Sequence, residues 1–179
     1  GKTSGIPVIE TEWLAEHSDG LIALSGGFRG HIGKAVLDTN HDLFLKRIKY
    51  FQKIFNEDFI LEISRINRPQ EDIYNDYILS KAGELGLPVV ASNEVRFIDK
   101  EDYEAHETRV CIQKGEVLSD ARRTRSYFED QYFLSSEEMY EKFKDIPEVL
   151  TNAYELGKKC NLEIETGIYV LPDFKTPLN

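Results

Sequence analysis

Short continuous runs of apolar residues alternate along this chain with longer stretches in which apolar residues recur at helical spacing. Runs without a polar face are typical of strands that are buried on both sides of a sheet. Such runs lie at residues 20–27, 58–65 and 87–92. The clearest helical pattern covers residues 41–55, where apolar positions form one stripe and lysine and arginine take the other face. The pattern therefore predicts strands that alternate with helices.

Capping and helix-breaking residues place the remaining predicted elements. Pro69 begins a helix that Gly86 ends, and Pro147 begins a last helix. The other expected helices cover residues 11–16, 31–40, 99–115, 139–143 and 148–160, with a final strand at 161–165 and an irregular stretch at 116–134. This order predicts an α/β fold in which helices cover a parallel sheet. We expect a single domain over residues 1–179.

Composition narrows the possible functions. The chain has 179 residues and a formal charge of −10, which disfavours a groove for nucleic acid. Its two cysteines, Cys111 and Cys160, lack the spacing of a zinc site and indicate reduced thiols. The sequence has no apolar run of membrane-spanning length and no signal peptide, so we expect a cytoplasmic protein. Because residue 1 is not methionine, we also expect an excised piece of a longer protein.

Polar residues follow each predicted strand where chemistry is usually found in α/β proteins. They are Ser25, Gly26 and Gly27 after the first strand, Glu62, Ser64 and Arg65 in the second, and Asn93, Glu94 and Arg96 after the third. The carboxyl ends of parallel strands share one rim, so these residues should converge there. Glu62 and Glu94 are weak candidates for binding Mg²⁺ or Mn²⁺. The plainer alternative pairs Glu62 with an arginine and leaves Glu94 an ordinary loop acid.

Other potentially reactive residues favour structural roles. The four histidines form neither an HxH nor a DxH motif, and His106 is expected to form hydrogen bonds on a helix surface. The glycine-rich loop before His31 could hold an anion, but it lacks the lysine of a phosphate-binding loop. The basic and aromatic stretch 122–128 could contact a phosphate or an acidic partner, or could be a solvated loop.

Several motifs carry a resemblance to a known family. The stretches "GLIALSGGFRGHIGKAV", "FILEISRINRPQEDIYN", "LPVVASNEVRFIDKEDYEAHETRVCIQKGEVL" and "YVLPDF" resemble the PHP (polymerase and histidinol phosphatase) domain of the α subunit of bacterial DNA polymerase III. The resemblance implies a partial, distorted (β/α) barrel of PHP type that lacks its N-terminal strands and their HxH motif. On this basis the chain is the C-terminal two-thirds of a PHP domain, with a core at about residues 6–174.

The chain departs from the metal-binding members of that family at each position that can be compared. Gly27 stands where a cysteine is expected, Ile66 where a histidine is expected, and Glu94-Val95-Arg96 where Asp-x-His is expected. An arginine side chain cannot lose its proton to bind a metal. The resemblance therefore implies a degenerate metal site, in which Arg96 supplies the positive charge and pairs with Glu94 or Glu62. Its remnant rim consists of Gly27, Glu62, Ile66, Asn93, Glu94 and Arg96.

The resemblance also implies a function for the longer protein. That protein would be a DNA-directed DNA polymerase using Mg²⁺, while this fragment would contain no catalytic residue and bind no cofactor. The implied partners are the rest of the α subunit, a proofreading exonuclease subunit and DNA, which is reached through the whole protein. One alternative is a residual metal-dependent phosphatase, pyrophosphatase or exonuclease using Glu62, Asn93 and Glu94. Another is a free-standing amidohydrolase-like barrel.

Overall fold

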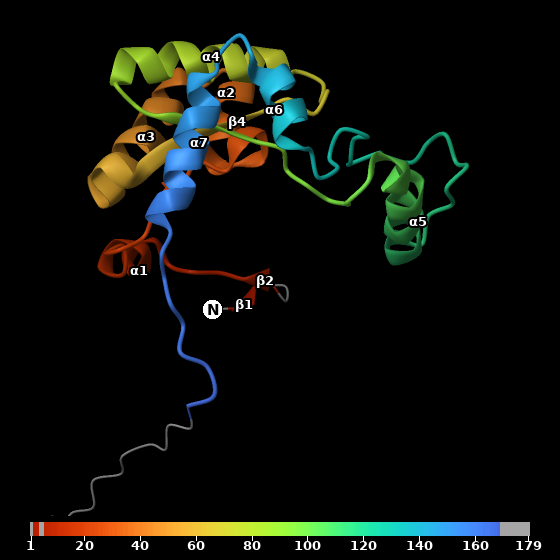
Figure 1. The fold of residues 1–179 in the computed structure, drawn as a ribbon, viewed down its shortest axis with the longest axis horizontal. Helices are drawn as coiled ribbons and strands as arrows, with labels where there is room; N and C mark the ends of the chain where they lie inside the picture. Colours follow the sequence, from red (N-terminus) through yellow and green to blue (C-terminus); the bar gives the residue numbers. More distant parts are fainter. Residues whose placement is uncertain (1, 4–5, 169–179) are drawn as a thin grey trace, which may run out of the picture.

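Three parallel strands lie at the centre of the computed structural model, which describes residues 2–3 and 6–168 (Figure 1). The strands are β3 (Ala23–Leu24), β4 (Phe59–Ser64) and β5 (Val89–Ser92), in the order β3-β4-β5. Leu24 pairs with Ile60, and Glu62 pairs with Val90. Nearly all of β4 is buried, which explains why its sequence reads as a continuous apolar run.

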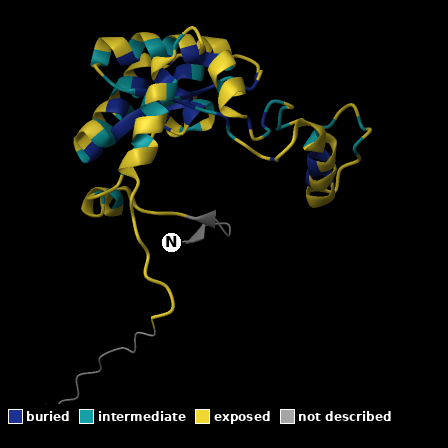
Figure 2. Ribbon diagram, in the orientation of Figure 1, coloured by how far each residue is buried: buried dark blue, intermediate teal, exposed yellow. Residues whose placement is uncertain are grey.

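Helices surround this sheet and bury its apolar residues. They are α2 (His31–Leu37), α3 (His41–Phe55), α4 (Glu71–Leu85) and α7 (Glu148–Lys159), with α6 (Ser136–Phe143) beside α7. The core contains the fully buried Phe44, Leu61 and Ile78. Figure 2 shows the buried positions gathered where these helices face the strands. No helix of the described residues is long and apolar enough to cross a membrane.

The remaining elements contribute less to this core. Helix α1 (Thr11–Glu16) has no buried residue, and β1 (Lys2–Thr3) pairs antiparallel with β2 (Ile6–Pro7). Short 3₁₀ turns are η1 (Gly27–Arg29), η2 (Asn56–Asp58) and η3 (Lys100–Asp102). Figure 1 shows α5 (Tyr103–Lys114) standing apart from the other helices. We call residues 97–134, which include α5, the α5 lobe.

The α5 lobe has its own small buried face, visible on α5 in Figure 2. Val110 and Cys111 are buried there beside Glu107, whose carboxylate pairs with Arg123 at 2.5 Å. His106 is also buried, and its Nδ1 has no hydrogen-bond partner in the described structure. The prediction that His106 forms surface hydrogen bonds is therefore wrong. Cys111 is a free cysteine and is buried on this face.

Glycine allows a close backbone contact at the start of α2. A Cβ atom on Gly33 would lie 2.4 Å from the carbonyl oxygens of both Gly27 and Phe28. A Cβ on Gly30 would lie 2.3 Å from the carbonyl oxygen of Ser25. These separations are far shorter than a real contact, so only glycine lets α2 pack directly on the loop that follows β3.

Most predicted elements are confirmed, including the parallel sheet. Helix α6 begins with a capping box, in which the Ser135 hydroxyl accepts a hydrogen bond from the Glu138 N–H at 3.2 Å. The first strand is shorter than expected, with only two paired residues. The predicted strand at residues 161–165 is wrong, because that segment is exposed and has no strand partner in the described structure. The motif at residues 169–174 lies outside the described residues. A mixed α/β fold is thus confirmed.

Candidate functional site

Polar residues from β3, β4 and β5 meet where these strands end, as the sequence predicts. The Ser25 hydroxyl accepts a hydrogen bond from the Glu62 N–H at 2.9 Å, and the Tyr74 hydroxyl donates to the Glu62 carbonyl at 2.8 Å. Gly27 lies next to the Glu62 side chain, since a Cβ there would be 3.9 Å from Cδ. Burial raises the pKa of the Tyr74 hydroxyl, so it remains a proton donor. Gly27 and Glu62 are therefore neighbours on this rim.

Glu71 is a buried acid at the first position of α4, and it closes the end of β4. Its Oε1 accepts a hydrogen bond from the Ser64 hydroxyl at 3.0 Å, and its Oε2 accepts one from the Ile66 N–H at 2.7 Å. Burial raises the pKa of the Glu71 carboxyl, while these two hydrogen bonds oppose that rise. The Asn75 side chain donates to the Ser64 carbonyl at 2.8 Å. This carboxylate is thus used to hold the turn between β4 and α4.

An ion pair occupies the rim between β4 and β5. Arg68 Nη2 lies 2.6 Å from Glu94 Oε2, and the two side chains are 4% and 17% exposed. The Ser64 hydroxyl is also 3.4 Å from Glu94 Oε1. The Arg68 guanidinium carbon lies 4.7 Å from the centroid of the Phe28 ring and 5.7 Å from that of Phe128. A buried, charge-paired guanidinium close to two aromatic rings therefore fills this position.

Arg96 is not the cation that pairs with the rim acids. It is exposed, and its guanidinium carbon lies 5.6 Å from the centroid of the Tyr127 ring. The predicted pairing of Arg96 with Glu94 or Glu62 is wrong, because Arg68 provides the charge from the β4 side. The plainer alternative also assigned the ion pair to the wrong acid: Glu94 is paired, and the Glu62 carboxylate has no ion-pair partner in the part of the chain described.

Amide side chains join the rim to the α5 lobe. Asn93 Nδ2 donates to the carbonyl oxygens of Asp130 at 3.1 Å and Tyr132 at 2.6 Å. Gln131 is fully buried, and its Nε2 donates to the Glu94 carbonyl at 2.9 Å. Glu94 has a left-handed backbone with φ of 46°, which this hydrogen bond holds in place. Asn93 is thus a structural link in this protein.

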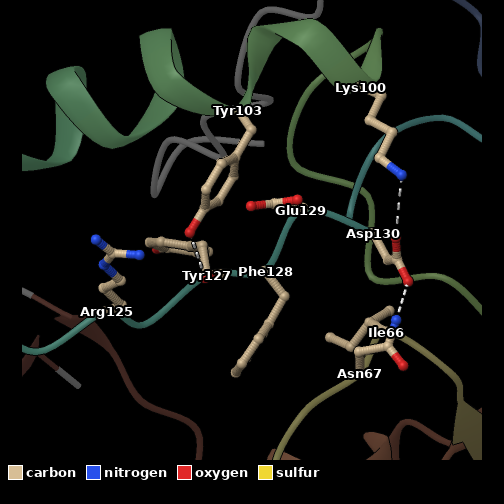
Figure 3. A pocket seen from close by; sticks show the side chains of 9 residues that line it. All are labelled: Ile66, Asn67, Lys100, Tyr103, Arg125, Tyr127, Phe128, Glu129 and Asp130. Carbon is tan, nitrogen blue, oxygen red and sulfur yellow. Dashed lines mark hydrogen bonds and ion pairs between the residues drawn. The ribbon is translucent and has the colours of Figure 1, made fainter.

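A pocket of about 430 Å³ opens between the rim and the α5 lobe (Figure 3). Its lining consists of Ile66, Asn67, Lys100, Tyr103, Arg125, Tyr127, Phe128, Glu129 and Asp130. Asp130 contacts Asn67 and Lys142, and its Oδ1 lies 4.0 Å from the Lys100 ammonium. The Tyr103 hydroxyl donates to the Tyr127 carbonyl at 3.2 Å. The pocket carries both signs of charge, and most of its polar groups already contact one another.

The donor set of the rim does not fit a metal of the PHP type. Gly27 and the fully buried Ile66 offer no side-chain ligand, and Glu94 already faces the Arg68 guanidinium. The described residues contain no group of three or more histidine, cysteine, aspartate or glutamate side chains that could hold an ion. A divalent cation beside Arg68 would also meet a fixed positive charge.

Sequence reasoning found the rim but missed Arg68 and Glu71. The sequence did contain a signal for both, because two arginines and two acids lie within the stretch 65–72, at and after the end of the second strand. An acid in the first turn of a helix is usually exposed to solvent, where it interacts favourably with the helix dipole. Its burial here depends on the turn that returns α4 over β4, which the sequence pattern does not show.

Comparison with known proteins agrees with the family suggested by the motifs. The profile of the PHP domain matches residues 2–66. DNA polymerase III subunit alpha of Pseudomonas aeruginosa is 43% identical over 177 residues, which is 99% of this chain and 15% of that protein. DNA polymerase III subunit alpha of Vibrio cholerae is 46% identical to this chain, and that of Escherichia coli is 44% identical. Both alignments cover 170 residues, which is 95% of this chain. The chain thus spans about 15% of the length of these relatives. The expected resemblance is confirmed, and the chain matches the PHP region of DNA polymerase III subunit alpha.

Proposed function

We propose that this chain is part of a replicative DNA-directed DNA polymerase and acts there as a structural and docking region. The similarity to three DNA polymerase III alpha subunits supports the whole-protein activity. Synthesis by such an enzyme uses Mg²⁺ at a site outside these residues, in the cytoplasm. The three parallel strands would form part of a distorted (β/α) barrel, with residues 1–179 as one domain. The proposed partners are the rest of the α subunit and a proofreading exonuclease subunit.

The Arg68–Glu94 ion pair is the observation that carries the structural role. In a metal-dependent hydrolase, acids at the strand ends remain free to bind cations and to orient water. Here the Glu71 carboxylate accepts hydrogen bonds from the Ser64 hydroxyl and the Ile66 N–H, and the Glu94 carboxylate forms an ion pair with Arg68. The polar groups of the rim thus stabilise the turns after β4 and β5, and we propose that the ancestral metal site is degenerate.

Metal titration of the full-length protein tests this proposal. Wild type is compared with Glu62→Gln, since Glu62 is the rim carboxylate without an ion-pair partner among the described residues. We expect the Mn²⁺ and Zn²⁺ isotherms of the two proteins to superimpose, because any binding would come from sites elsewhere. Both proteins should extend a primer equally well with Mg²⁺.

A residual phosphoesterase would give a different result. Wild type would then bind one metal ion that Glu62→Gln does not bind. Wild type would also release phosphate from p-nitrophenyl phosphate, or nucleotides from a DNA 3′ end, in a metal-dependent reaction that Glu62→Gln does not catalyse. That outcome would overturn the degenerate-site proposal. Failure of the full-length protein to extend a primer would instead overturn the assignment to a polymerase.

A further inference from the structure

Helix α3 is basic within an acidic chain. It contains Lys46, Arg47, Lys49 and Lys53 against one acid, Asp42, whereas the whole chain has a formal charge of −10. Within the described residues, none of these four cations belongs to an ion pair. Arg47 is held by a hydrogen bond from its guanidinium to the His31 carbonyl. Since unpaired charge of one sign attracts the opposite sign, this helix is suited to an acidic partner.

An apolar cleft of about 310 Å³ lies beside these cations, between α1 and α3. Its lining consists of Thr11, Leu14, His31, Leu43, Lys46, Arg47, Tyr50 and Phe51. We call this set the basic cleft. Its walls are mainly the side chains of Leu14, Leu43 and Phe51, and the Tyr50 hydroxyl closes one side by donating to the Thr11 carbonyl at 3.1 Å.

Exposed apolar groups also occur on α1, which forms one side of the cleft, and just before it. Trp13 is 48% exposed on α1, and Ile9 is 63% exposed just before it. Large apolar and aromatic side chains that remain exposed beside a cleft are typical of protein-binding surfaces. A cleft of this size can hold one large apolar side chain.

From these contacts we infer that the basic cleft docks an acidic segment of a partner protein, with one large apolar side chain of that segment in the cleft. This inference rests on the docking role proposed above. Carboxylates flanking the anchor would face Lys46 and Arg47, while the anchor would contact Leu14, Leu43 and Phe51. Duplex DNA is the less suitable occupant, because its phosphates would meet the cations while its bases stay stacked inside the double helix and would not enter the apolar cleft.

Fluorescence anisotropy with the full-length protein tests the inference. The probe is a labelled peptide, Asp-Glu-Asp-Leu-Phe-Glu-Asp, and its control has alanine in place of leucine and phenylalanine. Lys46→Glu should weaken binding by about tenfold, since it replaces an attraction by a repulsion. Lys53→Glu makes the same change on the same helix but does not line the cleft, so it should weaken binding by less than about threefold. Leu14→Ser should weaken binding with no change in charge.

Several outcomes would overturn the inference. Equal losses for Lys46→Glu and Lys53→Glu would indicate a diffuse charge effect, and equal binding of the alanine peptide would show that no anchor is used. Preferential binding of a mixed-sequence oligonucleotide that is lost with Lys46→Glu would assign the cleft to nucleic acid. The metal titration and primer extension do not involve α3, so a failure here is distinguishable from a failure of the proposed function.

Discussion

At the scale of single residues, Arg68 makes contacts of several kinds on the rim. Its charge meets Glu94, its face lies near Phe28 and Phe128, and its Nε and Nη1 are buried without a protein partner in the described structure. Buried N–H groups are usually satisfied by ordered water where protein acceptors are absent. The residue therefore couples the end of β4, the loop after β3 and the α5 lobe.

Replacing Arg68 by methionine should destabilise the protein strongly. Arg68→Met keeps much of the side-chain volume but leaves Glu94 without its cation, which costs about 3 kcal/mol for a buried pair. The free energy of unfolding of this region, measured by hydrogen exchange of β4 and β5 amides, gives the effect. Arg96→Met is the matched control and should cost less than about 1 kcal/mol, since it loses only an exposed contact with Tyr127. Equal costs would contradict the role assigned to Arg68.

The sequence predicts which positions form the rim but not how they pair. Glu62, Asn93 and Glu94 could be located because they follow or end apolar runs, and strand ends in a parallel sheet meet. Whether Arg68 or Arg96 pairs with Glu94 depends on the paths of the loops after β4 and β5, which the sequence pattern does not show. Arg96 is close to Glu94 in sequence, yet the left-handed backbone at Glu94 directs the chain away, toward the α5 lobe.

At the scale of elements, Arg65 links the end of β4 to the end of α6. Its two terminal nitrogens lie 2.5 Å and 2.7 Å from the Asp145 carboxylate oxygens, and its guanidinium carbon lies 4.9 Å from the centroid of the Phe143 ring. The hydrogen bonds from Arg65 lower the pKa of the Asp145 carboxyl from 3.8 to about 2. Both side chains reach solvent, so the pair contributes only modestly.

Asp145→Asn should lower stability at neutral pH by up to about 1 kcal/mol. Because the folded state lowers this pKa, the stabilisation is present above pH 3.8 and is lost as the pH falls toward 2. Urea unfolding followed by circular dichroism should therefore show a difference from wild type that disappears in strong acid. Glu141→Gln, which breaks the exposed pair with Lys144, is the control and should have a smaller effect. A difference that persists at pH 2 would contradict this explanation.

His106 should make the α5 lobe sensitive to mild acid. The centroid of its ring lies 4.6 Å from that of Tyr127 and 5.4 Å from that of Phe97. Burial of the imidazole lowers the pKa of His106. Arg109 and Arg96 lower this pKa further, while Glu107 opposes them. The folded state therefore favours the neutral ring, so the stabilisation present above pH 6.5 is lost as the pH falls below that value.

Hydrogen exchange of α5 amides, corrected for intrinsic rates, measures this effect. We expect protection to fall below pH 6.5 in wild type while α3 amides remain protected. His106→Phe keeps an aromatic ring between the same neighbours but cannot gain a proton, so the loss of protection should disappear. An unchanged pH dependence in this variant would assign the effect to another group.

The helices were predictable from local signals, whereas the extent of the sheet was not. Periodicity and the terminal residues Gly86, Gly115 and Pro147 act within a few residues. Helices α4 and α5 therefore end, and α7 begins, close to their expected positions. Pairing of β3 depends on residues far along the chain, and only Ala23 and Leu24 align with β4. Segment 161–165 has an apolar and polar alternation but no strand to pair with in the described structure.

At the scale of the whole molecule, the α5 lobe is joined to the helical body by a small set of polar contacts. Asn93 spans the junction from the end of β5, Gln131 spans it from the lobe, and Asp130 reaches Lys142 of α6 at 3.0 Å. The Arg29 side chain donates to the Ser126 carbonyl from the opposite side. The lobe therefore depends more on directed hydrogen bonds than on shared apolar burial.

Asn93→Ala should loosen the lobe without unfolding the body. The change removes two hydrogen bonds to the carbonyls of Asp130 and Tyr132, at a cost of about 2 kcal/mol. Limited proteolysis should then cut within residues 116–128 faster, while α3 and α4 remain intact. Asn152→Ala is the matched control, because Asn152 donates to the Val89 carbonyl from α7, on the body. It should loosen α7 and leave the lobe unchanged; the reverse pattern would contradict the assignment.

The close packing at the start of α2 limits which substitutions this part of the chain can accept. Even a methyl group on Gly33 or Gly30 would collide with backbone oxygens rather than with side chains that could turn aside. Gly83 and Gly157 have open space at the same atom and lie on α4 and α7. In a library of random variants selected for stable folding, Gly30 and Gly33 should survive almost unaltered, while Gly83 and Gly157 accumulate substitutions freely. Two glycines in a single turn would then mark a point of the fold that tolerates almost no substitution, even of a single methyl group.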